Sequence, residues 1–278
     1  MNSFLYYLSL EILWLKKTTE VYETEEIKEQ EEIAEELEEE AKDIKPSNKI
    51  EFDDEEFSKV TAEMKRLLLE GQTDKGHNTN VRKQTVIRLL HDYLVKKLQE
   101  KTGFKLREEC KEKDMVFIDT EVKIPGFHKV KNVDIAIVHK RAGPLLLISV
   151  KSLMSSITNN FTNVYEEAIG DAISLHERYP YLIYGYVIIF PTEVLIRDET
   201  FNLDYYEGFL RKINKRIDEQ DKDKKYERVS MVVSDFKAEP PKLTSKHPSD
   251  KDLRIETFIH DICEMLKERY EMLKIIKY

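Results

Sequence analysis

The spacing of apolar and polar positions along the chain predicts alternating helices and strands. Between residues 82 and 101, apolar side chains recur every three or four positions, which is typical of an amphipathic helix. Further helices are expected over 162–179, 207–221 and 253–273. Short apolar runs predict strands over 115–122, 132–139, 145–151, 184–190 and 227–235. This order predicts an α/β fold, with a mixed central sheet flanked by helices.

The first part of the chain has a different pattern. Residues 19–43 are rich in glutamate and carry only a weak heptad-like stripe of apolar positions. This predicts a solvated helix, which either lies on its own domain, mediates dimerisation or mimics the charge of DNA. A second helix is expected over 54–69, followed by a polar, glycine-containing joint over 70–80. We therefore predict a small helical, acidic N-terminal domain, 1–72, and a larger domain, 73–278.

Charge follows the same division. The chain of 278 residues carries a net charge of −9, but residues 1–60 alone carry −12 and residues 61–278 carry +3. The larger domain is therefore mildly basic and can bind a phosphate backbone if its lysines cluster.

Several other classes of protein are disfavoured. The most apolar early stretch, residues 4–15, is short and contains Glu11, whereas a bilayer-spanning helix needs about 20 apolar residues. The two cysteines have no metal-ligand spacing and are expected to be reduced thiols in a cytoplasmic protein. The sequence contains neither a P-loop nor a GxGxxG motif nor a Cys/His zinc pattern, so we expect no membrane partner, no nucleotide cofactor and no zinc.

One acidic residue interrupts an apolar strand. Asp134 lies inside the predicted strand over 132–139, and burying an unpaired carboxylate is costly. Lys151 ends the next predicted strand, 17 positions later, so two adjacent antiparallel strands would bring both side chains to one end of the sheet. A bound cation would offset the cost of burying Asp134, and oxygen ligands suit Mg²⁺. A lysine beside the metal can orient a water or help to deprotonate it.

These residues resemble the PD-(D/E)xK nucleases, and type II restriction endonucleases in particular. Asp134 matches the first acid of the motif, although Val133 stands in place of proline, and Lys151 matches the motif lysine. Ser149 occupies the place of the second acid. Some restriction enzymes that cut within CCGG share this serine and take the missing acid from the following helix.

The resemblance covers roughly residues 82–235 and implies a restriction-endonuclease-like core. The displaced acid would be Glu166 or Glu167, of which spacing favours Glu166, because adjacent helical residues point about 100° apart. In the family, the carbonyl of the residue between acid and lysine also binds the metal, which here implies Val150. Residues 152–165 contain no arginine, unlike the CCGG-cutting enzymes, so their recognition sequence is not carried over.

The implied activity is Mg²⁺-dependent hydrolysis of phosphodiester bonds at a specific double-stranded DNA sequence. Asp134, Val150 and Glu166 would hold the metal, and Asp134, Lys151, Glu166 and Ser149 would form the catalytic group. A twofold-symmetric homodimer, or a higher homo-oligomer, would match palindromic DNA. Two alternatives stay open: a structure-specific or defence-related nuclease of the same fold, and a non-catalytic interaction protein.

Residues suited to contacting DNA lie on both sides of the motif. The candidates are Lys75, Arg82, Lys83, Ser152, Ser155, Ser156, Asn159, Asn160, Asn163 and Arg228. Glu121 could be a further metal ligand, although an exposed glutamate at a sheet edge is the simpler interpretation. For His91, on the amphipathic helix, the simpler interpretation is a surface histidine.

Overall fold

A computed structural model describes residues 52–71, 84–112, 114–195, 199–217 and 221–275, with side chains described as far as residue 269. The chain divides into two compact units, one of residues 46–266 and the other of residues 1–45 together with 267–278. The sheet belongs to the first unit. No helix in the described ranges is long and apolar enough to cross a membrane.

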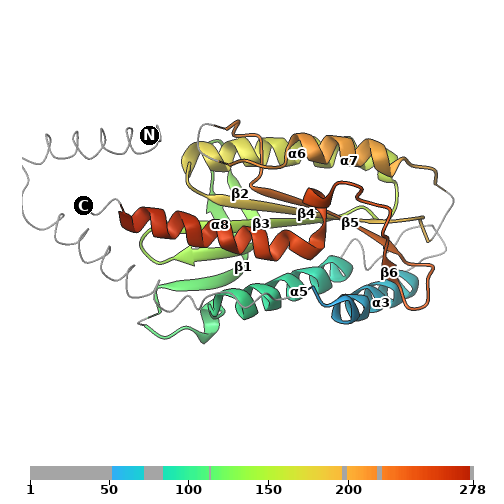
Figure 1. Ribbon diagram of the computed structural model, residues 1–278, viewed down its shortest axis with the longest axis horizontal. Helices are drawn as coiled ribbons and strands as arrows, with labels where there is room; N and C mark the ends of the chain where they lie inside the picture. The colour runs from blue at the N-terminus through green and yellow to red at the C-terminus, as the bar shows by residue number, and fades with distance from the viewer. Residues whose placement is uncertain (1–51, 72–83, 113, 196–198, 218–220, 276–278) are drawn as a thin grey trace, which may run out of the picture. The chain divides into compact units, whose positions relative to one another are not determined.

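A mixed sheet of six strands forms the centre of this unit (Figure 1). In spatial order the strands are β1 (Val116–Pro125), β2 (Val130–His139), β3 (Gly143–Ser152), β4 (Ile183–Pro191), β5 (Arg228–Asp235) and β6 (Lys242–Leu243). The β1–β2, β2–β3 and β5–β6 pairs are antiparallel, whereas β3–β4 and β4–β5 are parallel. The predicted mixed α/β architecture is confirmed, while the two-residue strand β6 was not predicted.

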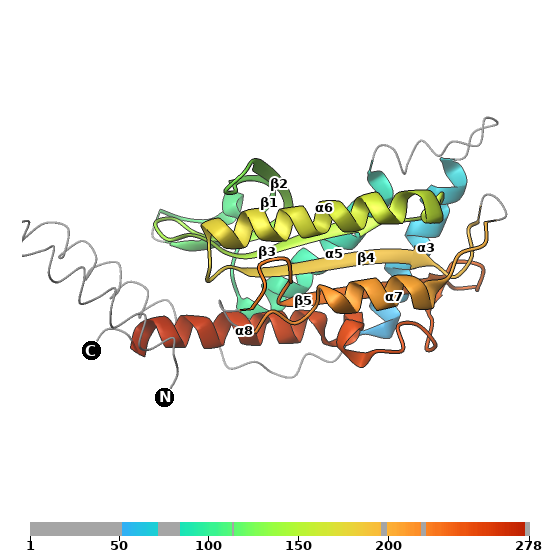
Figure 2. The same ribbon diagram turned by 90° about the horizontal axis from the view of Figure 1, so that it is seen from above.

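Helices cover both faces of the sheet (Figure 2). One hydrophobic cluster joins one face to α3 (Asp54–Glu70), α5 (Thr85–Thr102) and α8 (Ile255–Ile275). A second cluster joins the opposite face to α6 (Ile157–Arg178) and α7 (Leu203–Lys212). Strand β4 is buried along its whole length because it lies between both layers, as its continuous apolar sequence indicates.

The helix expected over 207–221 is wrong in its boundaries, because α7 begins and ends earlier. The Asn202 side chain caps the start of the helix by accepting a hydrogen bond from Tyr205 N at 3.2 Å. Beyond the helix, Asn214 accepts from Val229 N at 2.8 Å and donates to the Asp252 carbonyl at 3.1 Å. These bonds fix the chain against β5 and therefore direct it away from a helical path.

Helix α3 packs on α5. The rings of Phe57 and Tyr93 meet edge to face, with centroids 5.1 Å apart, and Phe57 is buried. The division of the chain after residue 45 places α3 in the same compact unit as the sheet. The predicted domain boundary at residue 72 stays a prediction, because residues 72–83 lie outside the described residues, as does the acidic stretch 19–43.

Strands β2 and β3 separate part of the way along the sheet. Their pairing reaches Ile135 opposite Ile148, whereas β3 continues to pair with β4 as far as Ser152 opposite Ile189. The place where the two strands part lies directly beside Asp134.

Candidate active site

Asp134 fills the gap that the parting strands leave. Its Oδ2 accepts a hydrogen bond of 2.7 Å from the backbone N–H of Val150 on β3. The side chain thus replaces the backbone acceptor that β2 would otherwise supply. This contact involves the amide of Val150; whether its carbonyl binds a metal stays a prediction.

Burial makes the negative charge of Asp134 unfavourable. Its side chain is only 22% exposed, and this burial raises the pKa of the carboxyl. The Val150 N–H and the charges of His91 and Lys151 act in the opposite direction without cancelling the effect. A cation bound to Asp134 would therefore favour the ionised form.

His91 is buried rather than on the surface, which corrects the simpler interpretation of the sequence. It is 6% exposed, and its Nε2 lies 3.9 Å from Oδ1 of Asp134. This nitrogen has no hydrogen-bond partner among the described residues. Burial lowers the pKa of the imidazole, which favours the neutral form that can bind a metal.

Glu121 on β1 lies close to both His91 and Asp134. Its Oε1 lies 3.8 Å from Nδ1 of His91, and its Oε2 accepts a hydrogen bond of 3.1 Å from Asn132. The backbone of Glu121 has φ +53°, a left-handed conformation that is uncommon for a residue with a side chain. One ligand atom from each of Glu121, His91 and Asp134 lies within 4.8 Å of the other two. Two carboxylates and an imidazole thus converge and could together hold a divalent cation.

Lys151 contacts the second of the two glutamates on α6. Its Nζ lies 3.5 Å from Oε2 of Glu167; both Glu167 and the adjacent Glu166 are exposed. Glu167 is thus the glutamate beside Lys151, and the assignment of Glu166 as the displaced acid stays a prediction. Oε1 of Glu167 also accepts a hydrogen bond of 2.7 Å from Lys131 on β2. The two lysines outweigh the effect of burial, so the pKa of Glu167 lies below its ordinary value.

Ser149 points into the core. It is buried, and its hydroxyl shares a hydrogen bond of 2.7 Å with the hydroxyl of Tyr184 on β4. Ser149 stands where the resemblance places the second acid. It thus forms a buried hydroxyl pair and brings no carboxylate to the site.

The residues predicted to contact DNA are dispersed. Lys75, Arg82 and Lys83 lie outside the described residues. Half-buried Ser152, Ser155 and Ser156 precede α6, and exposed Asn159, Asn160 and Asn163 lie in its first two turns. The backbone amides of Ser156 and Thr158 are bound by the carboxylate of Glu199, at 2.7 and 3.2 Å. The exposed asparagines are therefore the part of this segment best placed to meet a ligand.

The side chain of Arg228 is buried and bonded within the interior. It is 4% exposed, it donates to the Asp252 carbonyl and, at 2.8 Å, to the hydroxyl of Thr257, and it pairs with Asp261 on α8. The prediction that it contacts DNA is thus corrected: these contacts join β5 to α8, because the guanidinium is enclosed between the two elements.

Comparisons with known proteins give no relative from which to assign a function. No protein-family model matches the chain, and neither the curated proteins nor the solved structures that were searched contain a significant match.

Proposed function

We propose that the chain is a Mg²⁺-dependent DNA endonuclease with a restriction-endonuclease-like core and an active site centred on Asp134. The observation that carries this proposal is the convergence of Asp134, Glu121 and buried His91 where β2 and β3 part, with Nε2 of His91 lacking a hydrogen-bond partner among the described residues. The nitrogens of His91 lie 3.8 Å from Glu121 and 3.9 Å from Asp134, beyond the range of a hydrogen bond. A cation bound between these groups would account for the separations.

Each residue of the proposed site would have a separate role in the reaction. Asp134, Glu121 and His91 would hold the cation, with the Val150 carbonyl as a further ligand. When bound, Mg²⁺ supplies positive charge that stabilises the developing charge on a phosphate. Lys151, whose side chain is 32% exposed, would orient the attacking water and share its charge with the phosphate. Glu167 would position Lys151, in the place that the family resemblance gives to the displaced acid.

Double-stranded DNA is the substrate that the resemblance favours, with Asn159, Asn160 and Asn163 as candidates for contacts to the backbone or to base edges. A homodimer cutting a palindromic site, or a nuclease specific for branched DNA, would use the same residues. The two are distinguished by the substrate that the protein cuts.

Asp134→Asn tests this proposal, because it keeps the shape of the side chain and removes its charge. We expect the variant to fold, to bind DNA and to lose Mg²⁺-dependent cutting. Cutting at the wild-type rate by Asp134→Asn would refute the assignment of the site.

The buried pair of Ser149 and Tyr184 favours one other candidate, a non-catalytic protein that binds its partner through this fold. Loss of the second acid is one way in which a nuclease site decays. This alternative predicts DNA or protein binding that is unchanged by EDTA.

A further inference from the structure

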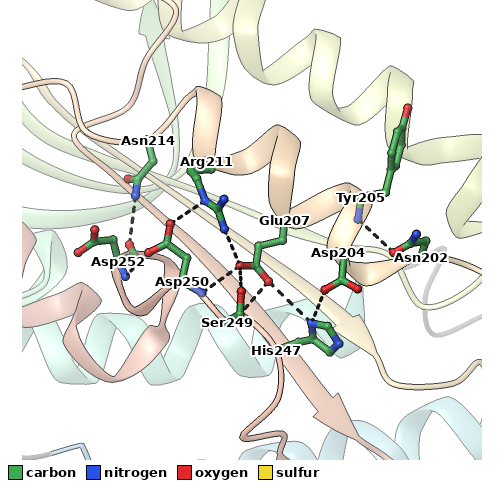
Figure 3. Close-up of polar contacts among 10 residues, drawn as sticks. All are labelled: Asn202, Asp204, Tyr205, Glu207, Arg211, Asn214, His247, Ser249, Asp250 and Asp252. Atoms are coloured by element: carbon green, nitrogen blue, oxygen red, sulfur yellow. Dashed lines mark hydrogen bonds and ion pairs between the residues drawn. The ribbon is translucent and has the colours of Figure 1, made fainter.

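A second group of side chains converges at the start of α7 (Figure 3). Nδ1 of His247, on the loop between β6 and α8, lies 3.6 Å from Oδ1 of Asp204 and 3.7 Å from Oε2 of Glu207. One ligand atom from each of these three residues lies within 4.8 Å of the others. None of them belongs to the Asp134 site.

The distances fit a shared cation better than direct hydrogen bonds. Both exceed the range of about 2.7–3.2 Å for an N–H···O hydrogen bond. Two ligand atoms of one tetrahedral zinc, each bound at about 2.0–2.2 Å, are separated by about 3.3–3.6 Å. The same nitrogen of His247 faces both carboxylates at nearly this separation, so one ion could bind all three residues with small adjustments.

The histidine itself indicates a missing ligand. His247 is 9% exposed, and its Nδ1 has no hydrogen-bond partner within the described ranges of the chain. A buried polar atom without a partner is unfavourable, and such atoms are uncommon in folded proteins. The nitrogen points at the two carboxylates rather than into apolar surroundings, as Figure 3 shows.

Glu207 is held in place for such a role. Its Oε1 accepts hydrogen bonds from Ser249 Oγ at 2.6 Å, Asp250 N at 2.9 Å and Arg211 Nη2 at 3.0 Å. Its Oε2 accepts from Ser249 N at 3.0 Å and faces His247. These hydrogen bonds fix the carboxylate, with Oε2 directed at His247.

We propose that Asp204, Glu207 and His247 form a binding site for a transition-metal ion of the Zn²⁺ class. One imidazole nitrogen and two carboxylate oxygens form a donor set that zinc accepts. The Asp204 side chain is 75% exposed, so the fourth position opens to solvent and takes a water. The ion would fasten the first turn of α7 to the loop that carries His247. Sequence patterns gave no expectation of zinc, because Glu207 and His247 are 40 positions apart.

Zinc binding by the full chain tests this site. The protein is stripped with EDTA, dialysed against Zn²⁺ and assayed for bound metal and for its thermal unfolding temperature. The test variant is Asp204→Asn, which changes a side chain that is 75% exposed. Its matched control is Asp252→Asn, which removes a carboxylate that faces Lys215 instead. Both substitutions are introduced into a parent variant that already carries Asp134→Asn and His91→Gln, so that the site around Asp134 contributes no zinc.

In this background we expect one zinc per chain and a higher unfolding temperature with Zn²⁺ than without it. Asp204→Asn should weaken zinc binding by at least about tenfold, since losing a ligand should cost no less than losing a residue that supports one. Asp252→Asn should bind zinc as its parent does. The proposal is overturned if the parent binds no zinc, or if Asp204→Asn binds it as tightly as Asp252→Asn does.

Discussion

Lys151 and Glu167 form an ion pair, with Nζ and Oε2 3.5 Å apart, across the gap between β3 and α6. The adjacent Glu166 is exposed and provides a matched control on the same helix. If Glu167 positions Lys151, Glu167→Gln should lower the rate of DNA cleavage by about 10–100-fold, the usual effect of losing a supporting residue. Glu166→Gln should cut as the wild type does. Cleavage assays at saturating Mg²⁺ decide this, and equal rates for the two variants would remove Glu167 from the site.

His91 offers a test of the metal site that is separate from Lys151. His91→Gln removes the nitrogen that faces Asp134 and should raise the Mg²⁺ concentration for half-maximal cleavage by at least about tenfold. High Mg²⁺ should then restore much of the rate, because the carboxylates remain. The control is His128→Gln, in which an exposed histidine on the β1–β2 turn is replaced. A Mg²⁺ titration that is the same for both variants would exclude His91 as a ligand.

The packing of α3 on α5 predicts a large effect on stability far from the site. Phe57→Ala removes a buried ring that contacts Tyr93 and should lower the free energy of unfolding by about 3–5 kcal/mol. Leu69→Ala, at a half-exposed position of the same helix, should change it by about 0.5 kcal/mol or less. Urea denaturation measures both values. A small effect of Phe57→Ala would mean that α3 is not part of the cooperative unit.

Glu56 predicts how pH affects the contact between α3 and α5. Hydrogen bonds from Lys96 and Lys97 hold the pKa of Glu56 below its ordinary value of 4.5. The bonds of Glu56 with the two lysines therefore stabilise the fold at pH values above 4.5. This stabilisation is lost as the pH falls through the lowered pKa of Glu56 in the folded state. Glu56→Gln should thus reduce stability at pH 7 by at most about 1 kcal/mol. The difference between variant and wild type should shrink as the pH falls below 4.5; a difference that does not shrink would show that the charge is not responsible.

The pattern of apolar positions in the sequence was sufficient to predict strands β1 to β5, but not the two-residue strand β6. The unbroken apolar run of β4 indicates a central strand, and the charge of Asp134 within an apolar strand draws attention to it. His91 also carried a signal, because it lies in the apolar stripe of its helix, three positions before Leu94, although a surface position was the simpler interpretation. Its proximity to Glu121 depends on how α5 lies on the sheet, which local spacing does not determine.

Other features depend on contacts between distant segments. The end of α7 is determined by Asn214 bonding to β5, and the choice of Glu167 over Glu166 depends on how α6 is rotated against the sheet. The convergence of Glu207 and His247 requires the loop after β6 to fold back onto α7. No periodicity in the sequence reports these arrangements, because each is fixed by tertiary packing.

Asp134 is the residue on which the proposed activity depends most, and incubation with a long plasmid of known sequence tests it directly. Wild-type protein and Asp134→Asn are compared in Mg²⁺ and in EDTA, together with a branched DNA. We expect wild-type cleavage in Mg²⁺ alone, with discrete plasmid fragments if the enzyme is site-specific. The variant should be slower by on the order of a thousandfold, equivalent to about 4 kcal/mol of lost transition-state stabilisation. Cleavage that persists in EDTA, cleavage by Asp134→Asn at the wild-type rate, or intact plasmid and branched DNA under every condition would contradict the account.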